Sequence, residues 1–250
     1  MKASIDNFSK QAAIYQQYRP SYPESFYHQL LALVENRTAC WDVGTGNGQV
    51  AVALSKHFDQ VFATDISQQQ LAQASTRANI TYRVERAEKT SFPADQFDFI
   101  TVAQAIHWFD FPAFYKEVRR VGKTGGILAV WGYGLHRVSP QIDAHIDIFY
   151  RDVIGDYWNE ERRHIDERYE SIGFDFKTIE LDQNLEMEVA WSLEQLEGYL
   201  NSWSSVQHFK KAHPETDPVA PTIAAIRPLW EDGTHKPIKF PIFTKIGRIE

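Results

Sequence analysis

The segment Asp42-Val43-Gly44-Thr45-Gly46-Asn47-Gly48-Gln49 has the composition of a ligand-binding loop. Its three glycines allow positive φ angles and let a ligand approach the backbone closely. The segment follows a short apolar run and leads into a predicted helix, whose first backbone N–H groups have no partner within the helix. We therefore expect Gly44, Thr45 and Gly46 to contact a bound small molecule.

A second acidic residue, Asp65, ends the next predicted strand, 21 positions after Gly44. A carboxylate at this place can accept hydrogen bonds from both hydroxyls of a ribose. The combination of strand, loop, helix, strand and carboxylate therefore predicts a ligand that contains a nucleoside.

The glycine spacing and Asp42 distinguish between two classes of nucleoside ligand, a dinucleotide and S-adenosylmethionine. The dinucleotide fingerprint is G-x-G-x-x-G, whereas this loop reads G-x-G-x-G and is followed by Gln49. The carboxylate of Asp42 would repel a pyrophosphate but would favour an ammonium or sulfonium group. S-adenosylmethionine carries both cations, so we predict it as the cofactor. A nicotinamide-dependent oxidoreductase and a cofactor-binding protein without catalysis stay open as alternatives.

Strand-like and helix-like segments alternate through the first half of the chain and would position this loop. The predicted strands cover residues 38–43, 60–66, 80–87, 97–105 and 126–133. Residues 24–36 and 50–58 have helical spacing, and Ser67 and Asp110 are N-cap candidates for two further helices. This alternation predicts a doubly wound parallel sheet whose ligand crevice lies beyond the C-terminal ends of its strands.

The second half of the chain has a different pattern and predicts a helical cover. Helices are expected to begin at Ser139 and Ser192 and to occupy residues 223–230, and the charged run 156–170 is interpreted as a solvated helix. Residues 236–249 predict a final strand, in which Pro241 marks an edge or a bulge. We expect a single domain with four parts: an N-terminal cover (1–36), a cofactor-binding core (37–135), a helical cover with a sixth strand (136–235) and a final strand (236–250).

The loop D-V-G-T-G-N-G-Q resembles the first motif of the class I S-adenosylmethionine-dependent methyltransferases, and A-T-D-I-S at 63–67 resembles their second. The resemblance spans about residues 38–133. It implies a seven-stranded, mostly parallel sheet with an antiparallel seventh strand, for which residues 174–182 and 238–249 are the expected last pair.

The same resemblance implies roles for residues at the strand ends. Asp65 would bind the ribose and Ile66 would lie against the adenine. Ala87 and Glu88 would contact the adenine edge, and Gln104 would hold the methionine part.

A narrower resemblance is carried by Y-R-P-S-Y-P at 18–23, A-I-H-W-F-D at 105–110 and Y-L-N-S-W-S at 199–204. These segments are similar to the branch that includes trans-aconitate methyltransferase-like enzymes, in which the N-terminal segment lies over the cofactor. The resemblance implies cofactor or substrate contacts for Tyr18 and Arg19, with a surface turn as the alternative. It also indicates a small organic acid as the acceptor.

His107 is the candidate for a general base, because it follows the fourth predicted strand and imidazole titrates near physiological pH. A carboxylate acceptor needs no base, whereas a hydroxyl or amine must lose a proton. The alternative is that His107 and Trp108 only form the pocket wall. Trp108, Trp131 and Tyr133 lie at strand ends and either line the substrate site or pack in the core. Arg137 either holds an acidic substrate or lies on the surface.

Composition limits the partners of the chain. The 250 residues carry a net charge of −7, which argues against broad nucleic-acid binding and against docking on anionic membranes. The methyltransferase resemblance implies a small-molecule substrate as the partner. The single cysteine, Cys40, suits a reducing cytoplasm, and the first twenty residues contain no apolar core of a signal peptide. The histidines lack the spacing of metal ligands, so no metal site is expected.

Overall fold

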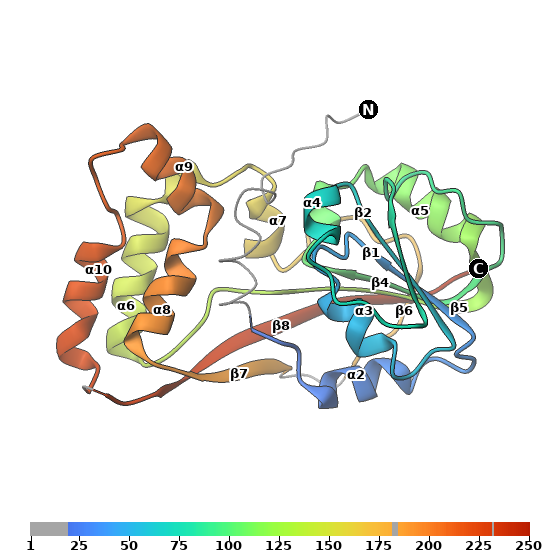
Figure 1. The fold of residues 1–250 in the computed structure, drawn as a ribbon, viewed down its shortest axis with the longest axis horizontal. Helices are drawn as coiled ribbons and strands as arrows, with labels where there is room; N and C mark the ends of the chain where they lie inside the picture. The colour runs from blue at the N-terminus through green and yellow to red at the C-terminus, as the bar shows by residue number, and fades with distance from the viewer. Residues whose placement is uncertain (1–19, 182–184, 232) are drawn as a thin grey trace.

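A computed structural model describes residues 20–181, 185–231 and 233–250 of the chain (Figure 1). Its strands are β1 (Ala39–Val43), β2 (Gln60–Asp65), β3 (Ile80–Val84), β4 (Phe97–Ala103), β5 (Gly122–Tyr133), β6 (Lys177–Thr178), β7 (Glu186–Trp191) and β8 (Lys236–Arg248). They form one sheet in the order β3-β2-β1-β4-β5-β8-β6, and β7 pairs with β8. Strands β1 to β5 are parallel, whereas β8 is antiparallel to β5. The predicted doubly wound, mostly parallel sheet is therefore confirmed, but it has eight strands among the described residues instead of the expected seven, because β7 also pairs with β8.

The central strand β1 is buried along its whole length between β2 and β4. Its register pairs Val43 with Val102 of β4, and Ala103 of β4 pairs with Trp131 of β5. Because these strands are parallel, the loop after β1 and the residues after β4 emerge at the same edge of the sheet. The predicted ligand-binding loop and His107 therefore lie at the same edge of the sheet.

Two of the four core helices begin at the capping residues that the sequence indicates. They are α2 (Glu24–Leu31), α3 (Gln49–Leu54), α4 (Gln68–Leu71) and α5 (Phe111–Val121), and a 3₁₀ turn η2 (Ile106–Trp108) follows β4. The Asp110 side chain accepts the Ala113 N–H at 3.2 Å, so it caps α5 as predicted. The Ser67 hydroxyl accepts the Gln70 N–H in the same way, although α4 is only four residues long.

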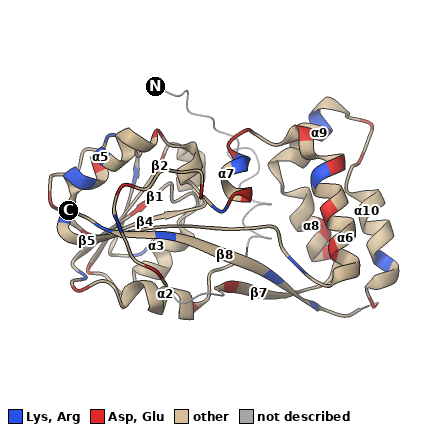
Figure 2. Ribbon diagram, turned by 180° about the vertical axis from the view of Figure 1, so that it is seen from behind, with Lys and Arg blue, Asp and Glu red and all other residues tan. Residues whose placement is uncertain are grey.

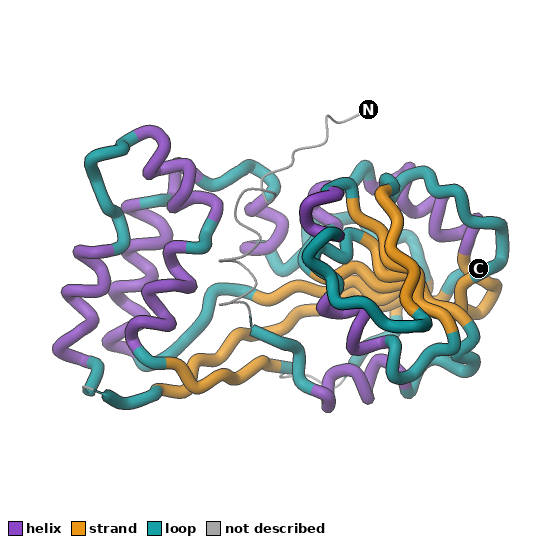
Figure 3. The backbone as a smooth tube through the Cα atoms, in the orientation of Figure 1, coloured by secondary structure: helices purple, strands orange, loops and turns teal. Residues whose placement is uncertain are grey.

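The second half adds helices, most of which lie at the far end of β8 (Figure 1). They are α6 (Pro140–Ile148) with its π-helical extension η3 (Phe149–Val153), the turn η4 (Gly155–Tyr157), α7 (Arg162–Asp166), α8 (Leu193–Asn201), α9 (Ser204–Ala212), α10 (Ala220–Ile226) and the turn η5 (Arg227–Leu229). We call the group α6, η3, α8, α9, α10 and η5 the helical lobe. Figure 3 shows that β5, β7 and β8 extend from the parallel strands toward this lobe, and α7 lies between the two parts.

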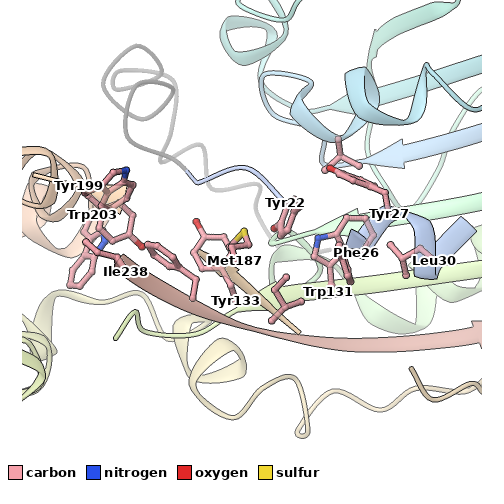
Figure 4. Packing of buried hydrophobic residues seen from close by; sticks show 14 of the residues in the cluster. Tyr22, Phe26, Tyr27, Leu30, Trp131, Tyr133, Met187, Tyr199, Trp203 and Ile238 are labelled. Atoms are coloured by element: carbon pink, nitrogen blue, oxygen red, sulfur yellow. The ribbon is translucent and has the colours of Figure 1, made fainter. Parts of the chain in front are cut away.

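One apolar cluster joins the sheet to the helical lobe. Figure 4 shows Phe26 and Trp131 at its core end, Tyr133 near the middle, and Tyr199 and Trp203 at its lobe end. Burial of such aromatic side chains is the main stabilising term in packing of this kind.

Several predictions for the second half need correction. Residues 156–170 do not form one solvated helix, because Trp158 turns into a cavity and Tyr169 is fully buried. Of the expected strand 174–182, only Lys177–Thr178 is extended with strand pairing among the described residues. The final strand is confirmed, but Pro241 lies inside an unbroken strand, where it is paired with Glu186 and its carbonyl accepts the Gly134 N–H.

Candidate functional site

The glycine loop after β1 leaves open space beside its backbone. Gly44 has φ +64°, and a Cβ there would lie 2.6 Å from Cβ of Ala105, so close packing requires glycine. Gly46 has φ +57°, but the nearest atom to a Cβ there would be Oε1 of Gln70, 3.9 Å away. The loop is therefore tightly packed at Gly44 and open at Gly46.

Asp65 at the end of β2 is joined to this loop by hydrogen bonds. Its Oδ2 accepts the Gly46 N–H at 2.8 Å, and its Oδ1 accepts the Ser67 N–H at 2.8 Å. The two bonds fix the carboxylate between the loop and the start of α4. The structure thus brings together Gly46 and Asp65, as the sequence predicts for two parts of one ligand site.

Asp42 is 1% exposed. Its Oδ1 accepts the Thr101 hydroxyl at 2.9 Å and its Oδ2 accepts the Thr45 hydroxyl. Burial raises the pKa of Asp42 to about 6, against the effect of the hydroxyls of Thr45 and Thr101. The structure therefore places this carboxylate inside the protein, where the Thr45 hydroxyl bonds it to the glycine loop. The sequence did not indicate Thr101 as a partner.

The residues expected around adenine lie at the ends of β2 and β3. Ile66 is 43% exposed although it is apolar, so it offers a hydrophobic surface directly after Asp65. Ala87 is buried. Glu88 pairs with Arg86 at 3.2 Å and accepts the Asp110 N–H at 3.1 Å, which ties it to the start of α5.

Gln104 directly follows β4 and has an unusual backbone, with φ +53°. Its Nε2 donates to the Tyr133 carbonyl at 3.2 Å, while its buried Oε1 has no hydrogen-bond partner in the described part of the chain. An amide oxygen in this state suits a ligand N–H donor, because an unsatisfied buried acceptor is costly.

A cavity lies beyond the C-terminal ends of β4 and β5 and faces the helical lobe. It is lined by Gln104, His107, Trp108, Tyr133, Gly134, Leu135, Trp158, Asn159, Arg162, Ile165, Tyr199, Ser202, Trp203 and Ser204. Its walls are rich in aromatic rings, of which Tyr133, Tyr199 and Trp203 are seen in Figure 4. Such a surface excludes water from a bound small molecule.

His107 lies in the wall of this cavity and is 4% exposed. Its Nδ1 is 3.2 Å from the hydroxyl oxygen of Tyr169, which is itself fully buried. Trp108 and Tyr133 also line the cavity, so these three predicted residues are brought together.

Two predicted substrate residues lie elsewhere. Trp131 is fully buried and packs against Tyr22 and Phe26, with ring centroids 5.7 and 5.4 Å apart, because α2 covers this part of β5 (Figure 4). Arg137 forms an ion pair with Asp147 at 2.7 Å and does not line the cavity. Tyr18 and Arg19 lie outside the described residues.

Other cavity residues were not predicted from the sequence. They are contributed by the segment around α7 and by α8 and the start of α9, and include Trp158, Arg162, Tyr199 and Trp203. The aromatic residues Tyr157 and Trp158 inside the charged run were a usable signal, because a solvated helix has no need of them.

Two further kinds of feature are absent from residues 20–181, 185–231 and 233–250. These residues contain no group of three or more His, Cys, Asp or Glu side chains placed to hold a metal ion. Within the same ranges, no helix combines the length and apolar character needed to cross a bilayer.

Comparisons with known proteins agree in the kind of protein they identify. A family model described as a methyltransferase domain matches residues 41–130. A Dictyostelium discoideum protein named as a methyltransferase is 37% identical over 83% of this chain and 80% of its own length. A Saccharomyces cerevisiae protein named as an S-adenosylmethionine-dependent methyltransferase is 24% identical over 66% of this chain and 61% of its own length.

The structural comparison extends over almost the whole chain. A solved structure from Anaeromyxobacter dehalogenans, named as a type II methyltransferase, superposes with a TM-score of 0.86 and 34% identity. The match covers 93% of this chain and 98% of that one, so it includes the helical lobe as well as the parallel sheet.

Proposed function

The chain belongs to the class I S-adenosylmethionine-dependent methyltransferases, and on that premise we propose that it transfers a methyl group from this cofactor to a small organic acceptor. The observation that carries the proposal is the Asp65 carboxylate bonded to Gly46 N–H at the open side of the glycine loop. This membership sets aside the nicotinamide-dependent alternative.

The residues present fit the proposed cofactor. Asp65 would accept the ribose hydroxyls and Ile66 would cover one face of the adenine, with Ala87 and Glu88 at its edge. Gln104 has a buried amide oxygen suited to the ammonium of the methionine part. When bound, S-adenosylmethionine supplies a methyl group on a positively charged sulfur.

The protein's part in the reaction is mainly positioning. Methyl transfer is an in-line displacement, so the acceptor must be held in one orientation and water excluded. The cavity beyond Gln104 and Tyr133 lies directly beside the proposed methionine site and has aromatic walls. Residues on the sheet side would hold the donor, and residues of α7 and the helical lobe would hold the acceptor.

The acceptor determines whether a base is used. A carboxylate, which the resemblance to the trans-aconitate branch favours, is already ionised and needs none. A hydroxyl or amine would pass its proton to His107, whose imidazole lies in the cavity wall with Nδ1 near Tyr169.

Isothermal titration of the purified chain with S-adenosylmethionine and S-adenosylhomocysteine tests the cofactor assignment. We expect Asp65→Ala to weaken binding by about 1.5–3 kcal/mol, because charge-assisted hydrogen bonds to the ribose are lost. Asp59→Ala, a change at an exposed aspartate, serves as the control. Unchanged affinity in Asp65→Ala, or binding of NAD(H) in place of S-adenosylmethionine, would contradict the proposal.

A further inference from the structure

The α7 side of the cavity has an arginine held in a fixed orientation. Nε of Arg162 donates to the Tyr150 hydroxyl at 2.7 Å and lies 3.5 Å from Oδ1 of Asp166. Its guanidinium carbon is 4.6 Å from the centre of the Trp158 ring. The Arg162 side chain is only 21% exposed. A guanidinium that is stacked and bonded through Nε is preorganised for recognition.

Two side chains of this wall, Arg162 and Trp158, present N–H donors. In the described part of the chain, the hydrogen bonds and ion pair of Arg162 all involve Nε, and its two terminal nitrogens make none. The buried Nε1–H of Trp158, beside the same guanidinium, also has no partner there. A buried donor without a partner, such as the Trp158 Nε1–H, costs free energy unless a ligand supplies an acceptor.

Charge distinguishes this wall from the rest of the cavity. Arg162 is the one Lys, Arg, Asp or Glu residue among the described residues that line it. Asp166 offsets this charge only in part, because it is 48% exposed and its Oδ1 already accepts the Tyr150 hydroxyl at 2.6 Å. The surrounding aromatic rings lower the local dielectric constant and strengthen attraction for an anion.

We propose that Arg162 and Trp158 bind a carboxylate of the methyl acceptor and so restrict the enzyme to organic acids. The planar guanidinium can donate two parallel hydrogen bonds to one carboxylate, and the indole N–H can donate a third. The inference rests on the proposed function, because it defines the acceptor class of the same cavity. Arg162 is here a specificity residue, and Tyr150 and Asp166 are its positioning residues.

Matched pairs of an acid and its amide test this proposal with simple probe ligands. Benzoate with benzamide, and cinnamate with cinnamamide, are titrated into the protein saturated with S-adenosylhomocysteine, and binding is followed by ligand-observed NMR. We expect each acid to bind at least about tenfold more tightly than its amide, because only the acid forms charge-assisted bonds.

Variants of Arg162 and Trp158 test whether these two residues cause the preference for acids over amides. Arg162→Gln is expected to weaken acid binding by about ten- to a hundredfold and to leave amide binding unchanged. Arg163→Gln is the control, because Arg163 is adjacent, 69% exposed and 3.9 Å from Glu167, and the change removes the same charge. Trp158→Phe, which keeps a ring and removes the N–H, is expected to weaken acid binding by about three- to tenfold.

The outcomes separate this proposal from the proposed function. Equal binding of acids and amides, absence of acid binding, or an acid preference that persists in both Arg162→Gln and Trp158→Phe would overturn the acid site. Retained affinity of Arg162→Gln for S-adenosylhomocysteine shows that the cofactor site is intact. If the wild-type chain fails to bind that cofactor, the proposed function fails, and the acid and amide titrations without cofactor still decide the anion site.

Discussion

The glycine loop and the aromatic cavity beyond β4 and β5 differ in how their buried polar groups are hydrogen-bonded. The cavity is the proposed site of the methyl acceptor. In the loop, Asp42 and Asp65 accept hydrogen bonds from hydroxyl and backbone groups around them. In the cavity, Oε1 of Gln104 and Nε1 of Trp158 are buried and have no partner among the described residues. The two aspartates of the glycine loop are therefore held by the protein itself, whereas the two cavity groups would be completed by ligands: Gln104 by the proposed cofactor and Trp158 by the proposed acceptor.

His136, a buried histidine behind the cavity wall, is a further polar side chain without hydrogen bonds in the described structure. His136 is fully buried near the rings of Tyr199 and Trp203, with centroids 5.5 and 6.0 Å away. Neither of its ring nitrogens has a hydrogen-bond partner in the described structure, and burial lowers the pKa of His136 to about 3. Changes on the two sides should therefore have different consequences for stability and for binding.

The largest effect is expected at His107, where the two regions meet. With a hydroxyl or amine acceptor, His107→Ala should lower kcat by about 10²- to 10⁴-fold, because proton removal loses its base. With a carboxylate acceptor, kcat should stay close to the wild-type value, because no proton leaves. Turnover of S-adenosylmethionine is measured with both acceptor classes. The comparison decides whether His107 acts as a general base or only forms part of the cavity wall. A near-wild-type rate on a hydroxyl acceptor removes His107 from proton transfer.

A change at Asp42 tests whether the donor side is built for binding at the expense of stability. The pKa of Asp42 rises from 3.8 to about 6 on folding, so stability falls as pH rises through this window. Above pH 6 the ionised carboxylate destabilises the fold by about 3 kcal/mol. Asp42→Asn should recover most of this at pH 8 and also bind S-adenosylmethionine more weakly.

Chemical unfolding of Asp42→Asn and the wild-type chain at pH 8 and pH 4.5, with cofactor titration at pH 8, measures both effects. The stability difference should shrink at the lower pH. Destabilisation of the variant at pH 8 would show that the Thr45 and Thr101 bonds outweigh the burial of charge.

His136→Phe gives the smallest expected effect and examines the acceptor side. The pKa of His136 falls from 6.5 to about 3 on folding, so the wild-type chain loses stability as pH drops through this window. At pH 5 the loss is about 2 kcal/mol, and the variant should not show it. Thermal unfolding at pH 8 and pH 5 tests this against His235→Phe, a change at a histidine outside the core. An unaltered acid sensitivity in His136→Phe would assign that sensitivity to other groups.

The parallel core could be predicted because its signals are local. A glycine loop between an apolar run and a helix, followed by Asp65, defines a place in the fold without reference to any distant contact. Trp131 shows the limit of this reasoning, since its position near a strand end does not reveal that Phe26 of α2 packs over it.

The acceptor side could not be predicted because its contacts join distant segments. Arg162 was interpreted as part of a solvated run, and only its contacts with Tyr150 and Trp158 show that it faces a cavity. Strand β7 was missed because its alternation is short, with Met187 and Trp191 buried and Glu186 and Glu188 exposed. Figure 2 shows the mixed charges on α7 that favoured the solvated interpretation.

Strand β8 acts as a strut between the two halves of the enzyme. Its 13 residues pair with β5 at one end and with β7 at the other, so a hinge within it would break interstrand hydrogen bonds. Strand β8 thus fixes the distance between the glycine loop of the parallel sheet and the helical lobe. Substitutions in the helical lobe would then change the proposed acceptor specificity, while the distance between the donor and acceptor sites stays constant.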